Sequence, residues 1–378
     1  MFFLCAVSHS AVEICGALVL AVWVFTGRFL RETRSWLASP PALPVLGMLL
    51  LPWLGLLYTS SPADGLSVAA RGYHWLYCIP LAAIMREKRA AEILVRLFLA
   101  GISLNSLFSL LQLAGAAPMK YGSPSGLLGI SSPWITYSLL LTAAIYIASF
   151  FFRRAGSAGE RSLYLFLMLL YFVTIGFVGG RSGYLAFILL SPLLVYNLIG
   201  GRHMARLLVL SAALVGVLFM FPVVQSRFAA IRSDLATFAQ GDVNTSVGLR
   251  LHMWSVACNE IKEHPFTGLG TEGFRDAWEL RKKGSRLPVF DHPHNSFLYV
   301  AVSYGLGGLA VFCWLIAVML LQGIRASASP AGFSLLIFTL VFVIGSLTDT
   351  QLLVFPTMLL FILSAGVSGA GLPATEAA

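Results

Sequence analysis

The feature that most constrains this chain is a series of long apolar stretches that recurs from one end to the other. A bilayer core about 30 Å thick is crossed by a helix of about 20 apolar residues, which satisfies its own backbone hydrogen bonds. Eleven stretches reach or approach this length, and they predict an all-α polytopic membrane protein. The expected spans are 4–26, 42–58, 69–85, 93–115, 133–152, 162–178, 183–200, 204–222, 294–321, 332–347 and 352–369.

Composition supports this class and argues against a soluble one. Hydrophobic residues make up 58% of the chain and charged residues 11%, whereas a soluble domain carries about 25% charged residues. The net charge of +9 does not indicate a nucleic-acid partner, because the basic residues lie mainly in short connectors between apolar stretches. The five cysteines show no CxxC spacing, so we expect neither a disulfide framework nor a metal site from them.

The basic connectors predict the topology. Five of them hold 12 of the 25 lysines and arginines, and the positive-inside rule places them in the cytoplasm. Segments 59–65 and 223–293 then lie outside, on the periplasmic face of a bacterial inner membrane. The expected organisation is about eight helices in 1–222, a loop domain in 223–293, and about three helices in 294–378. This odd count puts the two ends on opposite sides, and it leaves open whether a first helix is missing.

The outer segment 223–293 contains a predicted amphipathic helix. Its apolar residues recur at helical spacing, and the glycines of GLGTEGF after Pro265 predict a tight turn beyond its end. The apolar positions of this helix are Val247, Leu251, Trp254, Cys258 and Ile261.

His294 is the first candidate for chemistry. Pro293 is suited to a helix start, which would put His294 in the first turn of the span that follows. At 100° per residue, Gly305 returns to within about 20° of the face of His294, and Gly308 to within about 40°. These glycines would let a neighbouring helix approach closely. A helix N-terminus disfavours imidazolium, so we expect a neutral His294 that accepts a proton. The alternative is an ordinary interfacial histidine.

Two arginines on the expected outer side are further candidates. Arg181 lies in GFVGGRSGY, where the positive-inside rule disfavours a cation and paired glycines would let a ligand come close. Arg250 begins the predicted amphipathic helix in VGLRLHMW. The alternatives are contact with lipid headgroups for Arg181 and a solvated charge for Arg250. His292 and His294 form an HxH pair, but the sequence shows no third ligand that would make a metal site.

These pieces together resemble a known family. His294-Asn295, nine residues, and then Gly305-Leu-Gly-Gly308 are similar to the H-[NSQ]-x9-G-x-x-[GTY] pattern of bacterial O-antigen ligases. The wider superfamily includes O-antigen polymerases and protein O-oligosaccharyltransferases. GGRSGY, VGLR and HPFTGLGTEGF resemble that family's other segments, in its order, so the likeness covers roughly residues 165–320. The family usually has twelve spans with both ends in the cytoplasm.

The resemblance implies a glycosyltransferase of the GT-C fold type that uses no metal or other cofactor. Its donor would be an undecaprenyl-diphosphate-linked glycan, its acceptor lipid A–core oligosaccharide, and membrane lipids would surround it. Arg181 and Arg250 would bind the diphosphate. His294 would be the base, and Asn295 would orient the imidazole or a phosphate. Sibling enzymes with other acceptors remain possible, as does a lipid-linked-glycan transporter, although the two similar halves of a transporter are not visible.

Overall fold

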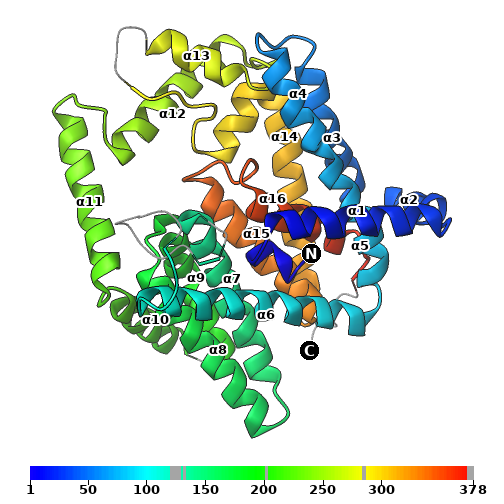
Figure 1. The fold of residues 1–378 in the computed structure, drawn as a ribbon, viewed down its shortest axis with the longest axis vertical. Coiled ribbons are helices and arrows are strands. Elements are labelled where there is room, and N and C mark those ends of the chain that lie inside the picture. Colours follow the sequence, from blue (N-terminus) through cyan, green and yellow to red (C-terminus); the bar gives the residue numbers. More distant parts are fainter. Residues whose placement is uncertain (120–128, 131–132, 201–202, 283–286, 373–378) are drawn as a thin grey trace.

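The computed structural model describes residues 1–119, 129–130, 133–200, 203–282 and 287–372, and in these ranges helices joined by loops are present and strands are absent (Figure 1). The first half contains η1 Leu4–Ala6, α1 His9–Phe25, α2 Phe29–Leu37, α3 Ala42–Gly55, α4 Pro62–Ala70, η2 Arg71–Tyr77, α5 Cys78–Met85, α6 Lys88–Leu113, α7 Trp134–Arg154 and α8 Ala158–Phe177. The second half contains α9 Arg181–Ile199, α10 Met204–Leu218, α11 Pro222–Ala239, α12 Ser246–Glu263, α13 Gly273–Arg281, α14 Ser296–Arg325, α15 Pro330–Ser346 and α16 Phe355–Ser368.

The length and composition of these helices confirm a polytopic membrane protein. Within the described ranges, five helices are long and apolar enough to cross a bilayer alone, namely α6, α7, α8, α9 and α14. Two further spans are possible if bent pairs count, with α1 and α2 meeting at 103° and α10 and α11 at 92°. The apolar helices α3, α15 and α16 are shorter. The structure therefore has helix in each of the eleven expected stretches, but fewer full-length spans than expected.

The stretch 69–85 shows why some expected spans are broken. It contains the end of α4, the 3₁₀ helix η2 and then α5, instead of one α-helix. Pro80 lies in the first turn of α5 and has no backbone N–H to bond the carbonyl of Leu76. Pro80 therefore interrupts the regular α-helical hydrogen bonds, and the chain forms the tighter 3₁₀ helix η2 directly before α5.

The core of the membrane part is built around α7. Its residues from Thr136 to Phe151 are all buried, and it packs against α8, α9 and α15. Small residues make the closest approach possible. A Cβ on Gly183 would lie 2.4 Å from the Cβ of Ser138, so only glycine lets α9 lie this close to α7. The Thr142 hydroxyl donates to the Gly183 carbonyl at 3.1 Å and fixes the same contact.

The segment between α10 and α14 is helical and has a small core of its own. Figure 1 shows α11 along one side of the molecule, with α12 and α13 at the end where α4 and the start of α14 also lie. Helix α12 covers the helix predicted over 247–261, and Thr245 caps it by accepting from Gly248 N. The predicted apolar face is wrong, because Cys258 is exposed and the buried residues are Gly248, Met253, Val256, Ala257 and Glu260. The buried residues of this core are Met253, Val256, Ala257, Phe274, Trp278 and Val302.

The two segments expected outside the membrane contact one another. The Thr59 hydroxyl donates to the Thr271 carbonyl at 2.7 Å, and Arg275 pairs with Asp64 at 3.0 Å. This contact agrees with the topology that the basic connectors predict, because segments on opposite faces of a bilayer could not meet. The domain boundaries at 222 and 293 stay a prediction.

Candidate active site

His294 lies just before α14, in the link that follows α13. The prediction that it occupies the first turn of the helix is wrong, because Asn295 takes the N-cap position. The Asn295 side chain accepts from Phe297 N and Leu298 N at 2.9 and 3.1 Å, so α14 begins at Ser296. The amide of Asn295 also donates to the Leu347 carbonyl at 3.1 Å. Asn295 thus caps the helix and ties it to the loop between α15 and α16, while His294 has a left-handed backbone with φ 50°.

A buried carboxylate orients the imidazole. Asp349, from the loop between α15 and α16, lies 2.8 Å from His294 Nδ1 and also accepts from Thr350 N at 2.8 Å. Burial alone would raise the pKa of Asp349, but the hydrogen bond and the charge of His294 outweigh it and lower that pKa. The carboxylate therefore stays ionised and accepts a hydrogen bond from Nδ1–H of His294, which leaves Nε2 as the basic nitrogen.

Sequence reasoning missed Asp349, although a signal was present. It lies in LTDTQ, a short polar stretch between two apolar ones. One acidic residue in such a connector has no spacing that links it to a histidine 55 residues earlier. The link exists only because α14 and α15 are neighbours, and the backbone N–H of Asn295 donates to the Thr350 hydroxyl there at 3.1 Å.

Aromatic groups enclose the imidazole. The His292 ring lies edge-on to His294 with 4.5 Å between centroids, and Phe290 lies 5.5 Å away. Burial, and after it the charge of the neighbouring His294, lower the pKa of His292 to about 4. His292 is therefore neutral near pH 7, and it adds no competing positive charge beside the base.

Three arginines line a cavity of about 410 Å³ beside this pair. Arg181 comes from the start of α9, Arg227 from α11 and Arg250 from α12. The two arginines that the sequence singled out, Arg181 and Arg250, lie 69 residues apart in the chain and face one space, while Arg227 had no distinguishing pattern. Thr348, next to Asp349 in the chain, lines the same cavity. Apolar side chains complete the wall, including Trp134, Leu185, Phe228 and Trp254.

The cavity carries an excess of positive charge. Asp234 lies 3.8 Å from Arg181 Nη1. Arg250 Nη1 donates to the Ser246 hydroxyl at 2.7 Å, and its Nε is fully buried with no hydrogen-bond partner in the described chain. Burial lowers the pKa of Arg250, and the charges of Asp349 and Asp234 act against that shift, so the guanidinium stays charged. Three guanidinium groups beside two carboxylates, Asp234 and Asp349, favour the binding of an anion.

Of the glycines around Arg181, Gly180 and Gly183 pack α9 against α7, whereas Gly179 lines the arginine cavity. A Cβ on Gly180 would lie 2.1 Å from the Ser138 hydroxyl, so α7 occupies the space beside it. The Ser182 hydroxyl bonds the Thr348 hydroxyl at 2.6 Å. Arg181 is thereby held at the first residue of α9, next to the loop that carries Asp349.

Gly305 and Gly308 do not share a regular helical face with His294. Gly305 interrupts α14 with φ 66° and ψ −170°, so a rotation of 100° per residue cannot be carried across it. A Cβ there would lie 2.3 Å from the Phe266 carbonyl, and Leu306 N donates to the Pro265 carbonyl at 2.8 Å. The close neighbour of Gly305 is therefore the loop after α12 and not a helix. Gly308 faces Tyr304 and Leu51 of α3.

Comparison with known proteins assigns this region to a family. The model for the family described as "O-Antigen ligase" matches residues 163–313. Residues 163–313 belong to the O-antigen ligase family. The resemblance seen in the sequence is confirmed, and the O-antigen ligase region contains all three cavity arginines, His292 and His294. Asp349 lies beyond it.

A relative from Haemophilus influenzae gives no further information about function. It carries the description "Uncharacterized protein" and is 31% identical over 90 residues. The aligned part covers 22% of this chain and 23% of the relative, so the chain spans about a quarter of that protein. The activity, substrates and partners of the whole protein are therefore proposals.

One group near the O-antigen ligase motif has the donor atoms of a metal site. Ligand atoms of His292, His294 and Asp349 all lie within 4.8 Å of one another, so Asp349 supplies the third ligand that the HxH pair lacked. Nδ1 of His294 already bonds this carboxylate at 2.8 Å. The expectation that the chain uses no metal stays a prediction, which chelation can test. A second group, Glu260, Glu263 and His264, is mostly exposed.

Proposed function

We propose that this chain is an O-antigen ligase of the bacterial inner membrane, which transfers an undecaprenyl-diphosphate-linked polysaccharide to lipid A–core oligosaccharide at the periplasmic face. The observation that carries the proposal is one arrangement: Thr348 lines the cavity with three arginines, and the next residue in the chain, Asp349, is the buried carboxylate that holds the imidazole of His294. The family match over 163–313 supports the class of enzyme, and the chemistry of the two substrates fits the two parts of the site.

The arginine cavity suits the leaving group of the donor. Cleavage of a glycosyl–diphosphate bond places negative charge on the diphosphate, and this charge needs stabilisation as it develops. Planar guanidinium groups bind phosphate oxygens bidentately and keep their charge at every physiological pH. Arg181, Arg227 and Arg250 face one space and supply such groups from three different helices. The apolar wall around them fits the lipid end of the donor.

The histidine pair suits activation of the acceptor. His294 Nε2 takes the proton of an acceptor hydroxyl while its oxygen bonds to the anomeric carbon, and the bond from that carbon to the diphosphate oxygen breaks with its electron pair. Asp349 then stabilises the imidazolium, as a buried carboxylate does beside a catalytic histidine. Attack opposite the leaving group inverts the anomeric centre. No step in this scheme needs a metal ion.

Purified protein gives the direct test. In proteoliposomes that contain lipid-linked polysaccharide and lipid A–core, we expect His294→Ala to slow transfer about 10²- to 10⁴-fold, the usual contribution of a general base. His264→Ala is the matched control, because this exposed histidine lies outside the site. Transfer should also survive treatment with a chelator. A His294→Ala variant that works at the wild-type rate would remove the histidine from the mechanism.

A deletion strain separates the ligase from its sibling enzymes, which would use the same donor. Loss of all polymer from lipid A–core, with lipid-linked polymer accumulating, indicates a ligase. Core that carries a single repeat indicates an O-antigen polymerase, and unaltered core with loss of glycan from proteins indicates a protein O-oligosaccharyltransferase.

A further inference from the structure

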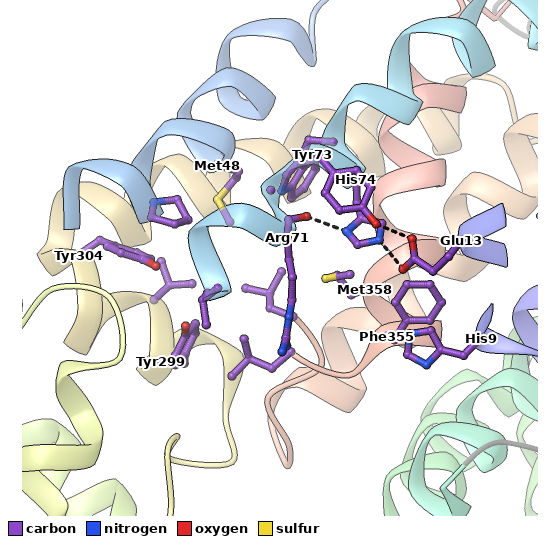
Figure 2. Close-up of a pocket in the computed structure, with 17 residues that line it drawn as sticks. His9, Glu13, Met48, Arg71, Tyr73, His74, Tyr299, Tyr304, Phe355 and Met358 are labelled. Carbon is purple, nitrogen blue, oxygen red and sulfur yellow. Dashed lines mark hydrogen bonds and ion pairs between the residues drawn. The ribbon is translucent and has the colours of Figure 1, made fainter. Parts of the chain in front are cut away.

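A second cavity, of about 420 Å³, lies among α1, α3, η2, α14 and α16 (Figure 2). Its lining combines a polar cluster with aromatic side chains. On one side Glu13 accepts hydrogen bonds from Tyr73 and from His74 Nε2, the latter at 2.9 Å. Tyr299 and Tyr304 of α14 line the opposite side. Apolar walls with a few convergent polar groups are typical of ligand sites.

Arg71 is the side chain in this cavity whose position is least explained by contacts within the chain. Figure 2 shows its side chain extending into the space between Tyr299 and Met358. Its guanidinium forms no hydrogen bond or ion pair with any residue in the described part of the chain. Arg275, by contrast, pairs with Asp64 and lies 3.5 Å from Asp291. An arginine that points into a cavity without a carboxylate partner is suited to an anion from outside.

Glu13 in the polar cluster can accept further hydrogen bonds from a ligand. A carboxylate offers about four acceptor positions, and Glu13 uses two of them for Tyr73 and His74. Its side chain is 33% exposed, so the remaining positions can be reached. Sugar hydroxyls are donors that fit this acceptor. Trp75 and Phe355 add flat apolar faces to the same wall.

One short stretch of the chain connects the cavity of Figure 2 to His294, the proposed base. Within residues 348–353, Thr348 lines the arginine cavity, Asp349 holds His294, and Leu352 and Leu353 line the cavity of Figure 2. On α14, Tyr299 follows His294 by five residues and lines it too. A ligand in this cavity therefore lies on a different set of walls from the diphosphate site, and the loop with Asp349 joins the two.

We propose that this second cavity receives the acceptor glycolipid: Arg71 binds an anionic group on its saccharide, a phosphate or a carboxylate, and Glu13 accepts a hydrogen bond from a sugar hydroxyl. The proposal rests on the proposed ligase function and names the place and the recognised group of its second substrate. It assigns the arginines of the first cavity to the donor and Arg71 to the acceptor.

A comparison of two kinetic constants tests this assignment. In Arg71→Gln we expect the KM for the acceptor to rise about 10- to 100-fold, the usual effect of losing a charge-assisted hydrogen bond, with the KM for the donor unchanged. Arg31→Gln is the matched control, because Arg31 is exposed on α2 outside this cavity. A rise in the donor KM, or no change in either constant, would overturn the assignment.

Modified acceptors identify the group that Arg71 binds. Removal of phosphates from the acceptor, or amidation of its carboxylates, should weaken its use by the wild type about as much as Arg71→Gln does. Arg71→Gln should lose nothing further on whichever modified acceptor lacks the recognised group. If the loss in Arg71→Gln is the same on the intact and on both modified acceptors, Arg71 contacts lipid headgroups and the proposal is wrong.

A binding measurement keeps this inference separate from the ligase proposal. Addition of acceptor alone should raise the Tm of wild-type protein in detergent, because a ligand that binds the folded state stabilises it. His294→Ala should show the same rise, whereas Arg71→Gln should not. If no variant transfers glycan but the rise persists in wild type and is lost in Arg71→Gln, the ligase proposal fails while the binding site stands. If the acceptor raises the Tm of Arg71→Gln fully, the binding site fails. Should Arg71→Gln itself be unstable, Arg71→Lys keeps the charge without the fork and is expected to bind weakly.

Discussion

The residues around His294 fix the tautomer and the orientation of its imidazole. Asp349 fixes the hydrogen on Nδ1, and the rings of His292 and Phe290 hold the imidazole from two sides. A histidine in a loop before a helix would otherwise sample several rotamers and both tautomers. The buried carboxylate removes this freedom, so the side chain presents Nε2 in one orientation.

The effect of this carboxylate can be measured with a nearly isosteric change. Asp349→Asn removes the charge that favours hydrogen on Nδ1 and that stabilises the imidazolium. We expect transfer to fall about 10²- to 10⁴-fold, as for other histidines that lose such a partner, with little change in the Tm of the protein in detergent. Asp242→Asn, in an exposed turn, is the control. Wild-type turnover by Asp349→Asn would show that the hydrogen bond does not serve the chemistry.

The arginines of the first cavity can be used to test whether the planar shape of the guanidinium is needed or only its positive charge. Arg250→Lys keeps a cation but loses the planar fork, so we expect a loss of transfer close to that of Arg250→Ala. Arg232→Lys is the matched control, because this residue is exposed on α11 and does not line the cavity. Initial rates at equal protein levels are the measurement. Near-normal rates for Arg250→Lys would mean that a positive charge suffices, and the bidentate model would then be discarded.

At the scale of the helices, the break in α14 is the feature with the largest structural consequence. Gly305 has a backbone conformation that residues with a Cβ rarely adopt, and the loop after α12 lies against it. The break joins the outer segment to the membrane part, because Leu269 N and Gly270 N donate to the carbonyls of Val302 and Ser303 at 2.8 and 2.9 Å.

Two nearby glycines of α14 should therefore respond differently to the same substitution. Gly305→Ala forces a Cβ toward the Phe266 carbonyl in a strained backbone region, and we expect a loss of stability of more than about 2 kcal/mol. Gly307→Ala meets nothing within 4 Å and should change stability by less than about 1 kcal/mol. Thermal unfolding in detergent compares the two. Equal Tm values would show that the break tolerates a side chain and does not fix the outer segment.

The elements that the sequence predicted well are those that depend on local pattern. Apolar length predicted the helices of the membrane part, and helical spacing predicted α12. The N-cap at Asn295 and the break at Gly305 were not predicted, because each depends on partners far along the chain: Leu347 for the cap and Phe266 for the glycine. The same reason explains the site, where Arg181 and Arg250 could be named singly but Asp349 could not.

At the scale of the whole molecule, the charge pattern of the connectors predicts which face is outside. Cys258 lies on α12 and is exposed. In intact spheroplasts we expect an impermeant thiol reagent to label it, and Cys258→Ser to abolish that labelling. Glu87→Cys in the Cys258→Ser protein is the matched control, since Glu87 is exposed in a basic connector and should react only after lysis. Labelling of the two positions in the reverse order would invert the proposed topology.

The short stretch 348–353 joins two cavity walls that can change independently as such proteins diversify. The lining of the arginine cavity comes from α7, α9, α11 and α12 together with Thr348, and that of the second cavity comes from α1, α3, α4, η2, α14 and α16 together with Leu352 and Leu353. Among the residues that the structure describes, none belongs to both walls. Substitutions that reshape one wall therefore leave the residues of the other wall unchanged, and residues 1–85 can vary without altering the lining of the arginine cavity. A chimera that exchanges residues 1–85 between two such proteins should accordingly inherit its acceptor preference from one parent and its donor from the other.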